Sequence, residues 1–223
     1  MTKSLSVIAS TTERVRRLFR RWRPPPINNA RDVVQFIDEN SAFVAQSSLY
    51  GYIKTRAGFE YFRLFEDPAF LQSINIAKWN IYAECAGDLT VFCGAHLRLL
   101  LPQHAETIPE MMNKCADDVF ARDKPEDADD KYPDIVQKVC ERIADTSWEH
   151  VRDDESPFSK SPEALVYWAP VSDTHKVHDA NIVRNSISFN WKEVRANFRR
   201  RAHAESLSRH IETFNPASAA RSQ

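Results

Sequence analysis

The segment from Ala69 to Leu101 constrains the fold of this chain most strongly. Prolines stand directly before and after it, and its 33 residues carry only four formal charges, on Lys78, Glu84, Asp88 and Arg98. A helix that is apolar on most of its surface must be surrounded by other elements to be stable in water. Asp67-Pro68 is a helix-start signal, because a capping aspartate precedes a proline in the first turn. The sequence therefore predicts a central, buried helix over residues 69–101.

The rest of the chain shows the apolar spacing of amphipathic helices nearly throughout. The sequence has only four glycines, which argues against a turn-rich β-sandwich or barrel. We predict an all-α fold, a single-domain helical bundle of about six to eight helices. Its expected parts are a basic amphipathic segment with a proline linker at 1–26, a helical domain at 27–214 and a disordered tail at 215–223.

Two long helices are predicted to flank the central one, and each has an apolar face. The first begins near Asn29 and includes Phe43 among its apolar residues. The last is predicted to turn six side chains inward, namely Ile182, Ile187, Phe189, Trp191, Val194 and Phe198.

Small side chains form stripes on two of the predicted helices. One stripe is Ser47, Gly51, Thr55 and Gly58, and the other is Ala83, Gly87, Thr90 and Gly94. A glycine inside a helix costs about 1 kcal/mol relative to alanine, so something must offset that cost. We predict close packing of the two helices through these stripes, with a groove for a ligand or partner helix as the alternative.

Charge is distributed unevenly along a chain whose net charge is −1. Residues 1–23 carry seven basic side chains and one acid, whereas residues 106–155 carry seven basic and sixteen acidic side chains. Residues 156–223 are basic again, with ten basic and six acidic side chains. Basic ends therefore flank an acidic middle, and they would either bind an external anion or neutralise that middle.

Residues 13–23 are the most distinctive part of the sequence. On a helix, an apolar stripe of Val15, Leu18, Phe19 and Trp22 would be surrounded by Arg14, Arg16, Arg17, Arg20, Arg21 and Arg23. Arginines suit anionic lipid, and tryptophan suits the headgroup region. Peripheral membrane binding is one interpretation. The others are targeting to an organelle by residues 1–26, and docking to a protein partner or to this chain's own acidic residues.

Several common chemistries have no motif in this sequence. The glycines match neither phosphate-binding pattern, and neither G-x-S-x-G, H-E-x-x-H nor Glu-x-x-His occurs. The four cysteines lack C-x-x-C spacing, so we expect reduced thiols in a reducing compartment and no cofactor. No apolar run approaches the roughly 20 residues that span a bilayer, which predicts a cytoplasmic protein, soluble or peripherally bound to a membrane.

Glu84 and Asp88 are candidate catalytic carboxylates. They lie one turn apart on the most apolar helix, on the same face as Asn80. Apolar surroundings would raise their pKa values and suit them to acid–base work or to holding a cation. The alternative is a pair of buried salt-bridge acceptors for a nearby base, with Lys54, Arg56 or Arg63 as the expected partners.

Two further groups are candidate binding residues. His175 and His178 would share a helical face and could bind a transition metal with Asp179, or with His203 or His210. A basic surface on the last helix could lie along nucleic-acid phosphates, or could be paired with the acidic middle of the chain; it comprises Arg195, Arg199, Arg200 and Arg201.

Together these features favour a non-catalytic adaptor or assembly factor. It would dock to a membrane surface or an anionic partner through residues 13–23, and a protein partner is expected. One alternative is an α-helical enzyme that uses Glu84 and Asp88 or a histidine-bound metal. The other is nucleic-acid binding through the basic last helix.

Overall fold

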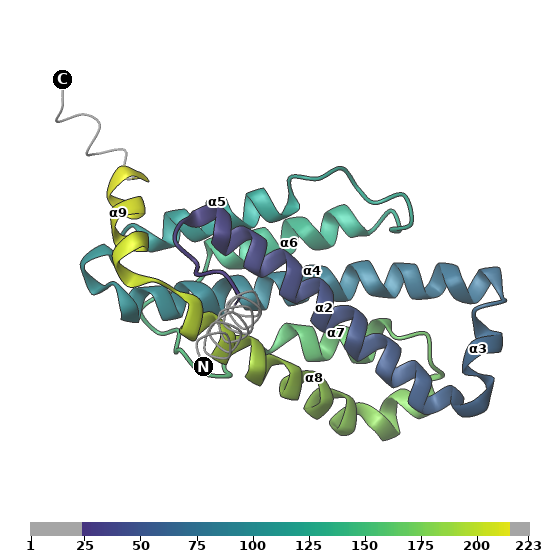
Figure 1. Ribbon diagram of the computed structural model, residues 1–223. Helices are drawn as coiled ribbons and strands as arrows, with labels where there is room; N and C mark the ends of the chain where they lie inside the picture. The colour runs from purple at the N-terminus through teal and green to yellow at the C-terminus, as the bar shows by residue number, and fades with distance from the viewer. Residues whose placement is uncertain (1–23, 215–223) are drawn as a thin grey trace, which may run out of the picture.

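The computed structural model describes residues 24–214, and within them the fold is an all-α bundle, as predicted. The predicted basic helix at 13–23 and the tail at 215–223 lie outside the described residues. The longer helices in Figure 1 are α2 (Ala30–Ala57), α4 (Pro68–Leu100), α5 (Ile108–Phe120), α6 (Tyr132–Ala144), α7 (Lys160–Trp168), α8 (Asp173–Arg201) and α9 (Ala204–Phe214). The short elements are η1 (Gly58–Glu60), α3 (Tyr61–Leu64) and η2 (Pro102–His104).

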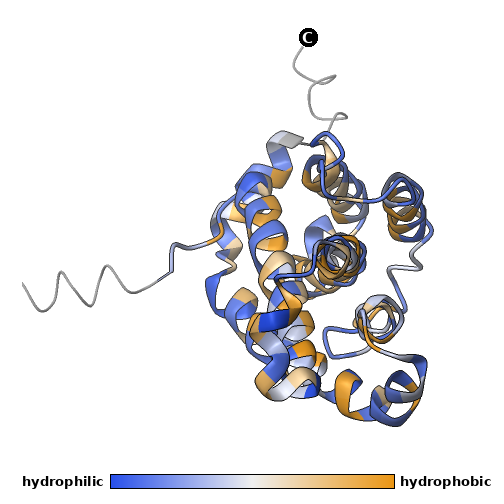
Figure 2. Cartoon of the chain, turned by 90° about the vertical axis from the view of Figure 1, so that its right-hand side faces the viewer, coloured by the Kyte–Doolittle hydropathy of each residue, from blue (hydrophilic) through white to orange (hydrophobic). Residues whose placement is uncertain are grey.

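Helix α4 is the central helix, which confirms the prediction from its low charge. Figure 2 shows it end-on with other helices around it, and α2, α5, α6 and α7 all pack against it. The Asp67 side chain accepts a hydrogen bond from the Ala69 amide at 2.9 Å, and Pro68 opens the first turn. No helix in residues 24–214 combines the length and the apolar character needed to cross a membrane.

Helix α2 begins at the predicted start, Asn29, and ends at Gly58, which the small-residue stripe had wrongly placed inside the helix. The Asn29 side chain accepts a hydrogen bond from the Asp32 amide at 3.0 Å, which satisfies one donor of the first turn. Gly58 ends the helix with a φ of +53°, a left-handed conformation that favours glycine. The chain then turns through η1 and α3 into α4. This turn exposes Phe59 and Phe62, so α3 forms an apolar tip at one end of the bundle.

The last predicted helix is divided in two. Helix α8 ends at Arg201, and α9 begins at Ala204, because the intervening backbone pairs with the start of the described chain. The Ile27 amide donates to the Arg201 carbonyl at 2.8 Å, and the His203 amide donates to the Ile27 carbonyl at 3.0 Å. This pairing replaces the helical hydrogen bonds that would have continued α8.

Three side chains that the sequence placed inside are exposed. Ile182 and Phe189 on α8 are 71% and 74% exposed, and Phe43 on α2 is 62% exposed. The inward prediction for Ile182 and Phe189 is therefore wrong. The stripe of α8 that enters the core starts one residue later, at Val183, and continues through Ile187, Trp191, Val194 and Phe198. Ile182 and Phe189 lie on the other side of the helix from this stripe, facing outward.

The glycine stripes pack differently from the prediction. A Cβ atom on Gly87 would lie 2.5 Å from Arg142 Nη2, and one on Gly94 would lie 2.2 Å from Trp148 Cζ3. A Cβ atom on Gly51 would meet nothing within 4 Å. Helices α2 and α4 do pack together, but the two stripes do not face each other. The glycines of α4 instead admit large side chains from α6 and from the segment after it.

Candidate functional site

The strongest functional candidate, residues 13–23, lies outside the described residues, but the structure describes the segment that follows it. The Pro25 carbonyl accepts a hydrogen bond from Arg201 Nε at 2.7 Å. Ile27 is fully buried, and its backbone pairs with the junction between α8 and α9. The Arg201 guanidinium lies 5.3 Å from the centre of the Phe36 ring. Residues 25–27 are therefore fixed to the folded domain, directly after the arginine cluster.

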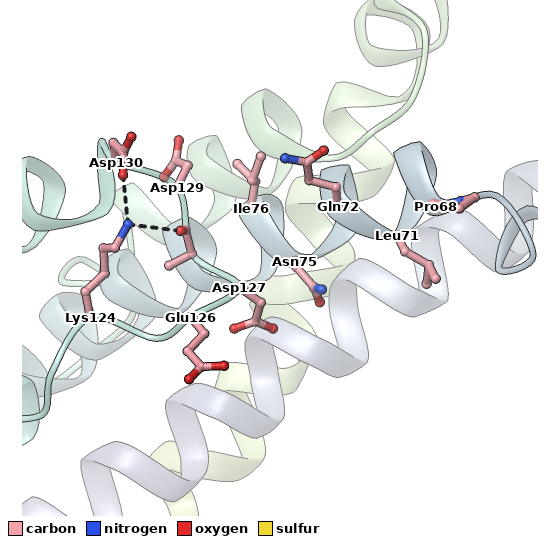
Figure 3. A pocket seen from close by; sticks show the side chains of 11 residues that line it. Pro68, Leu71, Gln72, Asn75, Ile76, Lys124, Glu126, Asp127, Asp129 and Asp130 are labelled. Atoms are coloured by element: carbon pink, nitrogen blue, oxygen red, sulfur yellow. Dashed lines mark hydrogen bonds and ion pairs between the residues drawn. The ribbon is translucent and has the colours of Figure 1, made fainter.

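An acidic hollow lies between the first half of α4 and the connection from α5 to α6 (Figure 3). It has a volume of about 620 Å³. Apolar side chains Leu71 and Ile76 form one side, and the acidic residues that line it are Glu126, Asp127, Asp129 and Asp130. The hollow contains the densest part of the acidic middle that the sequence revealed.

Two lysines already neutralise part of this hollow. Lys124 Nζ lies 2.8 Å from a carboxylate oxygen of Asp130, and Lys78 Nζ lies 2.8 Å from one of Asp127 (Figure 3 shows the first pair). Trp79 Nε1 also donates to Asp127, at 2.6 Å. Asp127 therefore acts as a structural link from the connection to α4, and the remaining carboxylates leave the hollow suited to a basic partner.

The predicted carboxylate pair forms ion pairs that join α4 to α6. Arg142 of α6 donates from Nη1 to Asp88 and from Nη2 to Glu84, each at 2.9 Å. The predicted partners Lys54, Arg56 and Arg63 are wrong, because α6, not α2 or α3, packs against this face of α4. The second oxygen of Asp88 accepts the backbone amides of Lys160 and Ser161, at 3.0 and 2.7 Å.

Asp88 thus caps the first turn of α7 from another helix. A carboxylate at a helix N-terminus satisfies free amide donors and interacts well with the helix dipole. Burial raises the pKa of Asp88 to about 6, although Arg142 and Ser161 act in the opposite direction. Ser161 Oγ in turn accepts a hydrogen bond from Trp191 Nε1 at 3.0 Å. This network can stabilise the packing of α4, α6, α7 and α8, and both oxygens of Asp88 are used in it.

The thiol nearest to this network is chemically quiet. Cys85 is fully buried, and burial, followed by the charges of Asp88 and Glu84, raises its pKa well above the ordinary range. A thiol must ionise to act as a nucleophile or a metal ligand. The position of Cys85 therefore disfavours both roles.

The histidine pair is exposed, and none of its predicted third ligands, Asp179, His203 and His210, forms a metal-binding group with it among the described residues. His175 and His178 lie on the surface of α8, whereas Asp179 is buried and bound to Arg56 and to the Tyr52 hydroxyl. Among the described residues, no three His, Cys, Asp or Glu side chains converge where a metal ion could be held. The predicted metal cluster is not assembled in this part of the chain.

Two of the four arginines of the predicted basic surface are paired with acids of the same chain. Arg199 Nη2 lies 2.7 Å from Asp153, and Arg195 Nη1 lies 3.1 Å from Glu155. Arg199 also stacks over the ring of Phe92, with 5.4 Å between the guanidinium carbon and the ring centre. These contacts correspond to the internal pairing that the sequence offered as the alternative to nucleic-acid binding. Arg200 stays exposed and donates to its neighbour Asn197 at 3.1 Å.

Comparison with known proteins does not add a function to this geometry. No family model, curated protein or solved structure matches the chain. The contacts described above and the sequence of residues 13–23 are therefore the features that bear on function.

Sequence analysis missed the contacts that organise these candidates. Arg142 is 54 residues from Asp88, and Arg56 is 123 residues from Asp179. The only available signal was the acidic count of residues 106–155, which correctly suggested partners for the basic last helix. Nothing in the sequence indicated that Phe43, Ile182 and Phe189 would be exposed, because the apolar periodicity marks them as ordinary apolar positions.

Proposed function

We propose that this chain is a non-catalytic helical adaptor or assembly factor that docks to an anionic membrane surface, or to another anionic partner, through residues 13–23. The observation that carries the proposal is the attachment of residues 25–27 to the junction between α8 and α9. An arginine-rich segment joined to a fixed point can transmit its binding to the whole domain. A long flexible linker would not impose any orientation on the domain.

The ion pairs of Arg195 and Arg199 also favour residues 13–23 as the surface that binds an anionic partner. Arg195 and Arg199 are engaged by Glu155 and Asp153, so they contribute little free positive charge. The six arginines of residues 14–23 remain the densest basic group in the sequence. Each basic residue near an anionic membrane contributes about 1 kcal/mol, so six could contribute about 6 kcal/mol before the cost of ordering the segment.

Flotation with lipid vesicles tests this proposal. The full-length chain should float with vesicles that contain phosphatidylserine and should stay in solution with neutral phosphatidylcholine vesicles. A full-length variant with all six arginines of residues 14–23 changed to glutamine should not float with either. A matched control carries Arg195→Gln and Arg199→Gln, which changes paired arginines and should leave flotation unaltered.

The acidic hollow offers residues 13–23 a competing partner within the chain. Charge reversal there, with Glu126→Lys and Asp130→Lys, should increase flotation if the segment also visits the hollow. Added salt at 1 M shortens the screening length to about 3 Å and should release the protein from the vesicles. If the full-length protein stays in solution with anionic vesicles at low salt, membrane docking through this segment is wrong.

A further inference from the structure

Gly51 is the glycine of this chain whose place the packing does not explain. Gly58 ends α2 with a positive φ, and Gly87 and Gly94 lie against large side chains from other elements. Gly51 lies inside α2, where a glycine weakens the helix relative to alanine, and a Cβ atom there would meet nothing within 4 Å. Packing therefore gives no reason for a glycine at position 51, and the space beside it needs another explanation.

The space beside Gly51 belongs to a groove between α2 and α8. The groove has a volume of about 270 Å³, and its lining includes Gly51 and Thr55 of α2, both members of the small-residue stripe. Ile182 and Val183 of α8 and Leu165 of α7 supply apolar surface. Val183 and Leu165 are buried, whereas Ile182 is 71% exposed. The groove therefore has an apolar interior, with Ile182 at its open edge.

An ion pair lies at one end of the groove. Asp179 and Arg56 both line it, and only 5% of the Asp179 side chain is exposed. Asp179 accepts hydrogen bonds from Arg56 Nη2 at one oxygen, and from Arg56 Nε and the Tyr52 hydroxyl at the other. At the opposite end, Asn190 donates to Ser48 Oγ at 3.0 Å. Ser48 and Arg56 are eight residues apart, so the groove is about 12 Å long between these polar ends.

The ion pair offers the groove hydrogen-bond donors rather than acceptors. Both oxygens of Asp179 are occupied, and they use only the Nε and Nη2 side of the Arg56 guanidinium. Among the described residues, Arg56 Nη1 has no hydrogen-bond partner, and 36% of the Arg56 side chain is exposed. A guanidinium has five N–H groups, so the edge formed by Nη1 and Nη2 can still receive two acceptor atoms side by side. A carboxylate matches this edge in charge and in geometry.

We propose that the α2–α8 groove binds a small aliphatic monocarboxylate. The carboxylate binds the free edge of Arg56, and the aliphatic chain lies beside Gly51, against Ile182 and Val183. A larger side chain at position 51 would project into this space, which accounts for the glycine.

The size of the groove limits the ligand. A volume of about 270 Å³ is about nine times the roughly 30 Å³ that a water molecule takes up in the liquid, so the groove has room for about nine non-hydrogen atoms. Sites for drug-sized molecules have volumes of about 300 to 1,000 Å³, so this groove suits a smaller molecule. Hexanoate, with six carbons and two oxygens, fits the groove in size, charge and apolar character.

Nuclear magnetic resonance of the full-length, ¹⁵N-labelled protein with sodium hexanoate at pH 7 tests this site. The amide signals of Gly51 and Ser186, which both line the groove, should shift and saturate with a dissociation constant of about 1 mM or lower. Hexanol has the same chain without the charge and should bind at least about tenfold more weakly. The absence of a saturable shift up to about 20 mM hexanoate, or equal binding of hexanol, would overturn the proposal.

Two substitutions separate loss of the site from loss of the fold. Gly51→Leu fills the groove and should weaken hexanoate binding at least about tenfold without lowering the thermal midpoint. Ile182→Glu places a negative charge at the groove and should weaken binding by a similar factor.

Phe189→Glu is the matched control for Ile182→Glu. Phe189 is 74% exposed and lies on the same helix, but it does not line the groove, so its replacement should leave the dissociation constant for hexanoate unchanged. Unaltered binding in Gly51→Leu or in Ile182→Glu, or equal losses in Ile182→Glu and Phe189→Glu, would refute the groove as the binding site.

Discussion

Replacing a glycine by alanine should have opposite effects at two positions of this bundle. In α2, a Cβ atom at Gly51 meets nothing within 4 Å. In α4, a Cβ atom at Gly94 lies 2.2 Å from Trp148 Cζ3, 2.6 Å from Trp148 Cη2 and 3.0 Å from Met112 Cγ. Both glycines lie inside helices, so the gain in helix propensity is common to the two substitutions. Only the surroundings differ.

The magnitudes follow from this comparison. Alanine favours a helix over glycine by about 1 kcal/mol, which is the expected gain in unfolding free energy for Gly51→Ala. At Gly94, ordinary contact begins at 3.4 Å, so the Trp148 ring would have to move by about 1.2 Å. Trp148 is buried, and overpacking of a well-packed core costs about 1 to 3 kcal/mol. We expect Gly94→Ala to destabilise the protein by up to about 2 kcal/mol after the helix gain of about 1 kcal/mol is subtracted.

Urea unfolding followed by far-ultraviolet circular dichroism measures both effects. At about 1 µM protein, Gly51→Ala should move the unfolding midpoint up and Gly94→Ala should move it down. Thermal midpoints should differ in the same direction, by about 2 to 4 °C for each kcal/mol. Shifts of the same sign for both variants would refute the claim that Trp148 occupies the space beside Gly94.

Two further predictions concern buried ionisable groups. Burial raises the pKa of Asp88 to about 6 from 3.8, so the folded protein holds this proton more tightly than the unfolded chain does. Its contribution to the free energy of unfolding should therefore fall by about 2 kcal/mol as the pH rises from 4 to 7. Asp88→Asn should remove this slope, and parallel stability curves for variant and wild type would contradict it. Burial raises the pKa values of all four thiols, but Cys85, Cys93 and Cys115 are buried whereas Cys140 is only partly buried. A disulfide reagent should therefore label only Cys140 quickly in the folded protein and all four thiols in urea; rapid labelling of a second thiol would contradict this.

The sequence predicted the elements whose signals are local. Asn29 and Asp67-Pro68 mark the starts of α2 and α4, and the low charge of residues 69–101 identified the central helix. The capping signals depend on residues within one helical turn, so they act in the same way in any tertiary fold. The break between α8 and α9 had no local signal, because it is made by Ile27 from the other end of the chain.

In the candidate site, the sequence predicted only those contacts that follow from the distribution of charge along the chain. Asp153 and Glu155 do pair with Arg199 and Arg195 of the basic last helix, which the unequal charge distribution suggested. Arg142 is the ion-pair partner of Asp88 because α6 packs against α4, and the spacing of residues along the sequence does not indicate this packing. Apolar periodicity likewise cannot separate Val183, which enters the core, from Ile182 beside it.

The backbone pairing of Ile27 with residues 201–203 also has a consequence for the time order of events during synthesis. A ribosome adds about 5 to 20 residues each second, so roughly 10 to 35 s pass between the addition of residue 27 and that of residue 203. Throughout this interval the arginine-rich segment has no attachment to the domain at Ile27. A partner that recognises residues 13–23 on a nascent chain therefore meets them before this contact exists. Only in the finished protein does the segment join the domain at a fixed point.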